Sequence, residues 1–280
     1  MTTVTAPGSS ANLGPGFDVL GVAIDRHAWV SDEGSGVRGD ELCGPDHLAR
    51  VAFELAGGRG PIWFGFDLRP SRGMGFSAAA RAAGAVLGRL HAGDDLAAAR
   101  FNAYDIVSEL EGHGDNAAPS VFGGIFVIAG DLAHPVAASL PGQLVLWIPE
   151  VTTATDESRA RLSDSVDRAD AVFNLGRVGL LMAALYENDS SLLRRATEDR
   201  LHQPTRLAAS PDSARAIEAA LDAGADAAWL SGSGPTVAVI VDPERVDGVC
   251  RALPDSGVAL PLAVDVSGSR INTSSATGDR

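Results

Sequence analysis

The sequence of 280 residues contains no lysine, so all 22 residues counted as lysine or arginine are arginines. A phosphate loop of the Walker type and a Schiff base each need a lysine amine, and both are therefore excluded. Negative charge predominates, with a formal net charge of −14 at pH 7. Sequence-independent binding to nucleic acid or to anionic lipid needs a basic surface, so we expect neither as a partner.

Cysteine is scarce as well. Cys43 and Cys250 are too few for a disulfide framework or a cysteine metal site. The N-terminus lacks a basic segment followed by an apolar one, and no apolar run approaches the ~20 residues that span a bilayer. We therefore expect a soluble, cytoplasmic protein without a signal peptide, and the hydrophobic fraction of 45% supports a sizeable core.

Strand and helix patterns alternate in both halves of the chain. Helices are expected at 47–55, 78–85, 95–112, 155–162, 167–188, 190–201 and 212–223. Asp46 is the candidate N-cap of the first of them. Strands are expected at 2–6, 19–24, 62–68, 121–129, 143–148, 227–230 and 236–241. Residues 267–280 are small and polar and should fray. After Pro149 several helix patterns follow one another before the next expected strand. This change, with strands and helices in both halves, predicts an α+β protein with a boundary near residue 150.

The most informative segment joins the expected strand at 62–68 to an alanine-rich helix. It reads Pro70-Ser71-Arg72-Gly73-Met74-Gly75-Phe76-Ser77-Ala78-Ala79-Ala80. Glycines let a ligand approach the backbone, and the free N–H groups of a first helical turn attract anions. The segment is either an anion site or an ordinary glycine-rich connection, and Ser77 either caps the helix or binds Mg²⁺ beside a phosphate.

Two further clusters combine carboxylates with amides or histidine. Asn12 and Asp18 lie in a loop of small residues, which suits a small polar substrate with an amino group or else forms Asx-type turns. The second cluster stands where an expected helix ends, and it consists of Glu109, His113, Asp115 and Asn116. Its carboxylate suits Mg²⁺ and its other groups suit a hydroxyl, whereas the alternative is a solvated helix end with a capping turn.

The fourth cluster, Ser231-Gly232-Ser233-Gly234-Pro235-Thr236, separates two expected strands. It is either a tight turn or a second glycine-rich wall over an anion. Arg159 and Arg206 can clamp a carboxylate with the fork of a guanidinium, although arginines on helices are usually solvated.

In this order the four clusters resemble those of the GHMP kinases, and within that superfamily those of the homoserine kinase family, over nearly the whole chain. The stretches that carry the resemblance are Ser9-Ser10-Ala11-Asn12-Leu13-Gly14-Pro15-Gly16-Phe17-Asp18, Gly112-His113-Gly114-Asp115-Asn116-Ala117-Ala118-Pro119 with Gly123-Gly124, Asp170-Ala171-Val172-Phe173-Asn174-Leu175-Gly176-Arg177 and Asp199-Arg200-Leu201-His202-Gln203-Pro204-Thr205-Arg206. The last two weigh most, because other GHMP kinases share the glycine-rich loops but not these stretches.

The resemblance implies transfer of the γ-phosphoryl group of ATP to the side-chain hydroxyl of L-homoserine, giving O-phospho-L-homoserine, a step toward threonine. It implies a two-lobed α+β fold, with an N-terminal nucleotide-binding lobe at 1–150 and a C-terminal, ferredoxin-like lobe at 151–280. It further implies Mg²⁺, a phosphate loop that does not depend on lysine, and a homodimer.

The resemblance also assigns individual residues. Those expected to bind homoserine are Asn12, Asp18, His113, Asn116, Thr155, Arg159 and Arg206, with Asp18 at the ammonium and the arginines at the carboxylate. Those expected to bind the nucleotide are Pro70, Arg72, Gly73, Met74, Gly75, Phe76, Ser77, Ala78, Ala79, Ala80, Gly232, Ser233 and Gly234. Ser77 and Glu109 match the metal side. His113, Asp115 and Arg206 match the reacting end, where direct attack by the hydroxyl leaves Asp115 a polarising part.

Phe76 departs from the family, which usually has a serine at this place in the loop. The backbone N–H remains, but the hydroxyl is missing, and a lost hydrogen bond to a charged group costs ~1.5–3 kcal/mol, roughly ten- to hundredfold. Two alternatives to a homoserine kinase follow: a GHMP kinase for another small alcohol, and a catalytically weakened homologue that binds ligands.

Overall fold

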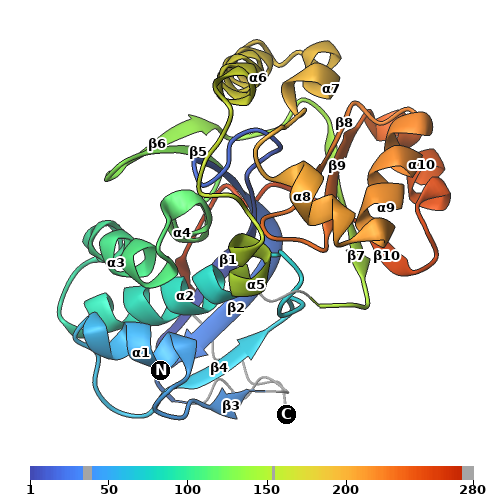
Figure 1. Cartoon of the computed structure of the whole chain (residues 1–280). Coiled ribbons are helices and arrows are strands. Elements are labelled where there is room, and N and C mark those ends of the chain that lie inside the picture. The colour runs from blue at the N-terminus through green and yellow to red at the C-terminus, as the bar shows by residue number, and fades with distance from the viewer. Residues whose placement is uncertain (34–39, 153–154, 273–280) are drawn as a thin grey trace.

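The computed structural model describes residues 1–33, 40–152 and 155–272. Within them, a seven-stranded and a four-stranded antiparallel sheet stand side by side, each accompanied by helices (Figure 1). The expected α+β class and the two-lobed fold are confirmed.

The larger sheet has the order β11-β1-β2-β4-β3, and the β5–β6 hairpin continues it through the pairing of β5 with β2. Its strands are β1 (Thr3–Ala11), β2 (Leu20–Ser31), β3 (Glu41–Leu42), β4 (Trp63–Phe66), β5 (Ile125–Ala129), β6 (Leu132–Ala137) and β11 (Arg270–Asn272). All of β1 is buried, because β2 and β11 flank it and helices cover it. β1 therefore carries its C-terminal end, at Ala11, into the interior of the molecule.

Two helices pack on this sheet, α2 (Phe76–His91) and α4 (Gly114–Phe122), and α1 (Leu48–Leu55) and α3 (Leu96–Glu111) pack against α2. The central one, α2, contacts α1, α3, α4 and β1. Its small residues permit these contacts at close range, since a Cβ at Gly84 would collide with the backbone of Ala49 in α1. The alanine run thus places the first turn of α2 firmly against the end of β1.

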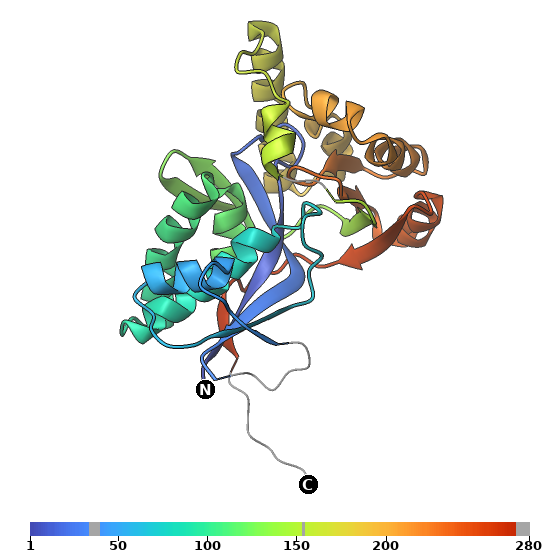
Figure 2. The same cartoon turned by 60° about the horizontal axis from the view of Figure 1, so that its bottom comes forward.

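The smaller sheet has the order β10-β7-β9-β8. Its strands are β7 (Gln143–Pro149), β8 (Ala227–Leu230), β9 (Val237–Val241) and β10 (Gly257–Leu262). The accompanying helices are α5 (Thr155–Ala160), α6 (Arg168–Glu187), α7 (Leu193–Ala196), α8 (Gln203–Ala208), α9 (Pro211–Asp222) and α10 (Val246–Ala252), with the 3₁₀ segments η1 (Ser190–Leu192) and η2 (Pro243–Arg245). Figure 2 shows α6 and its neighbours rising on one side of the larger sheet.

Several element bounds differ from the sequence expectation, because pairing between distant segments sets them. β1 continues to Ala11, into the segment expected to be a loop, since it pairs with the first residues of β2. Residues 270–272 form β11 against β1 instead of fraying, whereas 273–280 lie outside the described residues. Residues 121–122 end α4 and do not begin a strand. His47 caps α1 in place of Asp46, with its Nδ1 accepting from the N–H of Ala49 at 3.2 Å.

The boundary near residue 150 stays a prediction, and sheet membership adds detail to it. β7 precedes that boundary yet lies in the smaller sheet, while β11 follows it and joins the larger one. The chain therefore crosses between the sheets twice, from β6 to β7 and from β10 to β11, and the cleft between them collects residues from both halves.

α6 bears on the expectation that no segment of this chain spans a membrane. Among the described helices it is long and apolar enough, by length and composition, to cross a membrane. One such helix is weak evidence for a span, and Arg177 near its middle pairs with Glu198 at 2.6 Å. We assign no membrane segment from it.

Candidate active site

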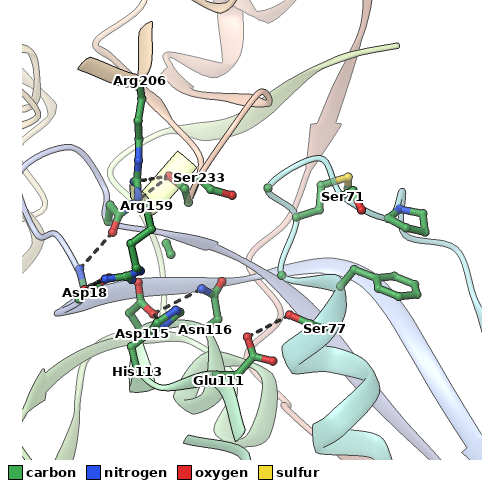
Figure 3. Close-up of a pocket in the computed structure, with 18 of the residues that line it drawn as sticks. Asp18, Ser71, Ser77, Glu111, His113, Asp115, Asn116, Arg159, Arg206 and Ser233 are labelled. Carbon is green, nitrogen blue, oxygen red and sulfur yellow. Dashed lines mark hydrogen bonds and ion pairs between the residues drawn. The ribbon is translucent and has the colours of Figure 1, made fainter. Parts of the chain in front are cut away.

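A cavity of about 270 Å³ lies where the end of β1, the first turn of α2 and the start of α4 meet helices α5 and α8 (Figure 3). It gathers residues from all four clusters found in the sequence. The predicted residues that line it are Asn12, Asp18, Pro70, Gly73, Met74, Gly75, Phe76, Ser77, His113, Asp115, Asn116, Arg159, Arg206, Gly232 and Ser233.

The glycine-rich loop at 70–75 ends in a helix terminus that is open to an anion. Gly75 is the N-cap of α2 and no side chain caps the first turn, so its N–H groups remain free to bind a ligand. Gly73 and Gly75 have φ values of 74° and 65°, in the left-handed region that favours glycine. A Cβ at Gly75 would also collide with Ser9 of β1. The loop can therefore lie this close to β1 only with glycine there.

Ser77 does not cap α2, because it donates its hydroxyl hydrogen to Glu111 Oε2 at 2.9 Å. Glu111 also pairs with Arg81 through its other oxygen. Figure 3 shows Ser77 and Glu111 facing each other across the space between α2 and α3. A hydroxyl and a carboxylate are oxygen ligands of the kind that Mg²⁺ takes together with phosphate oxygens.

Glu109, the carboxylate expected on the metal side, is exposed and does not line the cavity. Two residues along a helix turn the side chain by about 200°, so Glu109 and Glu111 point in nearly opposite directions. A sequence signal for Glu111 exists, since Ala99, Ala103 and Val107 form a buried stripe at spacing four and Glu111 continues it.

The start of α4 carries a compact polar group. His113 Nδ1 and Asp115 Oδ1 lie 2.5 Å apart, and Asn116 accepts from Ser9 Oγ at 2.8 Å. Asp115 is buried, with 1% of its surface exposed. Burial would lower the pKa of His113, but the hydrogen bond to Asp115 and its negative charge outweigh burial and raise that pKa. The contact with Asp115 therefore favours a protonated imidazole at His113.

Asp18 and Arg159 meet each other in the cavity. Arg159 donates from Nη1 to Asp18 Oδ2 at 2.8 Å and from Nη2 to Asp18 Oδ1 at 2.7 Å, in a two-pronged geometry. Both residues were expected to hold a charged substrate group, and the structure pairs them instead. Asn12, expected at the substrate, also supports the fold: its amide joins the N–H of Asp18 to the carbonyl of Gly232.

Arg206 is a buried cation, with 5% of its surface exposed. It donates from Nη1 to His202 Nδ1 and to the carbonyl of Gly232, each at 3.1 Å. Within the part of the chain that the structure describes, no carboxylate pairs with it, and its buried Nε–H has no partner. The pKa of Arg206 is lowered mainly by burial and further by the nearby positive charge of Arg159. A buried guanidinium with an unsatisfied donor at a cavity wall is suited to an anionic ligand.

The two stretches in the C-terminal half position the loop that carries Asp18. Asn174 in α6 donates to the carbonyl of Pro15 at 3.0 Å, and His202 Nε2 lies 2.8 Å from the carbonyl oxygen of Gly14. Asp199 accepts a hydrogen bond from the side-chain Nδ2 of Asn174 at 2.6 Å and another from the backbone N–H of His202. These three positioning residues are absent from the predicted site, although the stretches that contain them were noted.

The turn at 231–235 contacts both the glycine-rich loop at 70–75 and the end of β1. Ser231 Oγ donates to the carbonyl of Gly73 at 2.6 Å, and the N–H of Gly232 donates to the carbonyl of Ala11 at 3.2 Å. This turn therefore contributes Gly232 and Ser233 to the wall of the cavity, and its role over an anion stays a prediction.

Phe76 is the first residue of α2, and its ring packs on β4. It lies edge-on to Phe64 and Phe66, with centroid distances of 5.9 and 5.1 Å. The backbone N–H of Phe76 stays in the first helical turn. The aromatic side chain thus contributes to an apolar edge of the cavity and brings no hydroxyl to the glycine-rich loop.

The structure does not bring every predicted residue to the cavity. Arg72 turns away and donates to the carbonyls of Pro149, Pro70 and Glu150. Ala78, Ala79 and Ala80 are buried inside α2, and Gly234 supports the turn without lining the cavity. Thr155 begins α5, and its side chain lies outside what the structure describes.

Comparisons with known proteins identify the family of the chain. The family model described as GHMP kinases C terminal matches residues 181–259. The chain is 33% identical to homoserine kinase from Desulfitobacterium hafniense, covering 97% of this chain and 100% of that protein. It is 39% identical to homoserine kinase from Moorella thermoacetica, covering 85% and 86%. The crystal structure of homoserine kinase from Cytophaga hutchinsonii superposes with a TM-score of 0.82 at 25% identity, covering 97% of each chain. The chain belongs to the homoserine kinase family of GHMP kinases.

Proposed function

We propose that this protein transfers the γ-phosphoryl group of ATP to the side-chain hydroxyl of L-homoserine. The observation that carries the proposal is Arg206, a buried guanidinium whose Nε–H has no partner and which faces the cavity without an ion pair among the described residues. The carboxylate of an amino-acid substrate supplies the missing acceptor and the missing charge.

The Asp18–Arg159 pair suits a zwitterionic substrate. Homoserine would enter between them, its ammonium taking Asp18 and its carboxylate taking Arg159 together with Arg206. Such an exchange leaves no charge without a partner, so the loss of one ion pair is offset by the formation of two.

The nucleotide would bind on the other side of the cavity. The uncapped first turn of α2 points its N–H groups at the phosphates, and Gly73 and Gly75 allow the close approach. Ser77 and Glu111 would hold Mg²⁺, with Arg81 keeping the second oxygen of Glu111. When bound, the ion neutralises charge on the phosphate oxygens.

The residues of the reacting end mainly position the hydroxyl. Its oxygen attacks the γ-phosphorus, the bond between that phosphorus and the oxygen bridging to ADP breaks, and the hydroxyl proton is released. Because the transition state of phosphoryl transfer is loose, positioning and charge supply most of the acceleration. His113, held by Asp115, would orient the hydroxyl, and its raised pKa favours a positive charge near the phosphoryl oxygens.

A coupled ADP-release assay tests the proposal. We expect L-homoserine to give faster turnover than L-threonine, mevalonate or shikimate. Turnover no faster with homoserine than with the others would favour a kinase for another small alcohol. Binding of homoserine without any ADP release, reversed by Phe76→Ser, would favour the weakened homologue.

The two acidic residues at the end of α3 supply a matched pair of variants. Glu111→Gln should lower turnover strongly and shift the Mg²⁺ dependence to higher concentration, because it removes a charged metal ligand. Glu109→Gln removes the same charge from an exposed position and should match the wild type. Equal behaviour of the two variants would reject the metal assignment.

A cytoplasmic location and a homodimer belong to the same proposal. Light scattering of the purified protein measures the oligomeric state.

A further inference from the structure

A second cavity, of about 490 Å³, lies between α3, the end of α4 and the β5–β6 hairpin. These elements stand together at one end of the larger sheet (Figure 1). Cavities of this size hold small molecules. It shares no lining residue with the candidate active site, so the function proposed above leaves it unexplained.

Its walls are aromatic in a chain where aromatic residues make up only 5% of the sequence. The four rings that line it are Phe101, Tyr104, Phe122 and Phe126. Phe122 packs on Tyr104 and Phe126 with centroid distances of 5.6 and 5.5 Å. Tyr104 is 7% exposed, whereas Phe101 is 72% exposed. The cavity therefore has a packed aromatic floor and an open aromatic rim.

The charged lining residues are all acidic. They are Asp105, which follows Tyr104 in α3, and Asp131, in the turn of the β5–β6 hairpin. Within residues 1–33, 40–152 and 155–272, neither carboxylate makes a side-chain hydrogen bond or an ion pair. Burial raises the pKa of Tyr104, and the negative charges of Asp105 and Asp131 add to the effect, so both carboxylates act on the aromatic floor.

We propose that this cavity binds a small organic cation whose apolar body carries an ammonium or guanidinium group. The body would lie on the rings, which attract a cation through their negative faces. The charged group would lie between Asp105 and Asp131, the two lining carboxylates without a partner. An anion of the same shape would meet two negative charges and no positive one. The combination of rings and unpaired carboxylates selects charge as well as shape.

Calorimetry with three probes of similar shape tests the proposal on the full chain: 2-phenylethylammonium, neutral 2-phenylethanol and phenylacetate. We expect saturable binding of one cation per chain, about tenfold weaker binding of the alcohol, and still weaker binding of phenylacetate. The preference for the cation should shrink as salt is added, because the carboxylates are exposed.

Three variants locate the binding. Asp105→Asn should reduce the preference for the cation, whereas Glu109→Gln removes an equal charge from the same helix outside the cavity and should not. Phe101→Ala should weaken all three probes. Phe101, Asp105 and Glu109 are exposed, so the variants should keep the melting temperature of the wild type.

Two results would overturn the proposal. Equal affinity for the cation and the alcohol would make the cavity an apolar pocket without charge selection. Displacement of the cation by L-homoserine or ATP would move the probe to the candidate active site. Because the two cavities share no residue, a silent ADP-release assay would leave this proposal standing, and loss of cation binding would leave the proposed kinase standing.

Discussion

Replacing Arg206 by methionine separates ligand binding from folding. The variant keeps an unbranched apolar stem and removes the buried guanidinium. A hydrogen bond to a charged group contributes ~1.5–3 kcal/mol, so loss of the contact with the substrate carboxylate should raise the KM for homoserine about 10- to 150-fold. The KM for ATP should change little, because the phosphates bind at α2, on the other side of the cavity.

The same substitution should change stability little. It removes two hydrogen bonds of the charged guanidinium, to His202 and to Gly232, worth ~1.5–3 kcal/mol each. It also removes a buried charge that has no carboxylate partner in the described residues, whose desolvation costs several kcal/mol. These opposing contributions are of similar size, so the melting temperature should stay within a few degrees of the wild type.

Steady-state kinetics with each substrate varied, together with calorimetric melting, check both expectations. Arg215→Met is the matched control, because Arg215 is exposed on α9 and pairs with Asp212 outside the cavity. A KM for homoserine within twofold of the wild type, or an equal rise in the KM for ATP, would refute the assignment of Arg206 to the substrate carboxylate.

Three further predictions follow from the same structure. Gly75→Ala should abolish the thermal stabilisation of the protein by nucleotide, since the φ of 65° at Gly75 and its contact with β1 exclude a Cβ. Gly112→Ala is the matched control: Gly112 has a φ of 79° but open space around it, so the substitution should lower the free energy of unfolding by only about 1 kcal/mol. Phe76→Ser should lower the KM for ATP severalfold and lower the melting temperature, because a hydroxyl replaces a ring packed on β4; unchanged values in both assays would contradict this. The pKa of Asp265 falls to about 2 despite burial, because His27 and backbone N–H groups bind the carboxylate. Asp265 therefore stabilises the fold above pH 3.8, and this contribution is lost as the pH falls toward 2. Asp265→Asn should therefore flatten the acid limb of stability measured by urea unfolding between pH 2 and 5.

Local patterns determined much of the fold, because their causes are local. The alanine run, the glycines before it and the capping residues at the ends of α3 define those elements without help from distant segments. β11 and the last residues of β1 could not be found this way. They are strands because the partner strand is present, and that partner comes from elsewhere in the chain.

The site follows the same division. The sequence by itself determined that no lysine is available to an anion site, that Gly73 and Gly75 precede a helix, and that carboxylates, amides and arginines accompany them in a fixed order. Only the tertiary structure decided which groups meet: Glu111 faces Ser77, Asp18 pairs with Arg159, and Arg206 is buried without a carboxylate. These contacts join segments far apart along the chain, and whether a side chain has a partner depends on the packing of both lobes rather than on its neighbours in sequence.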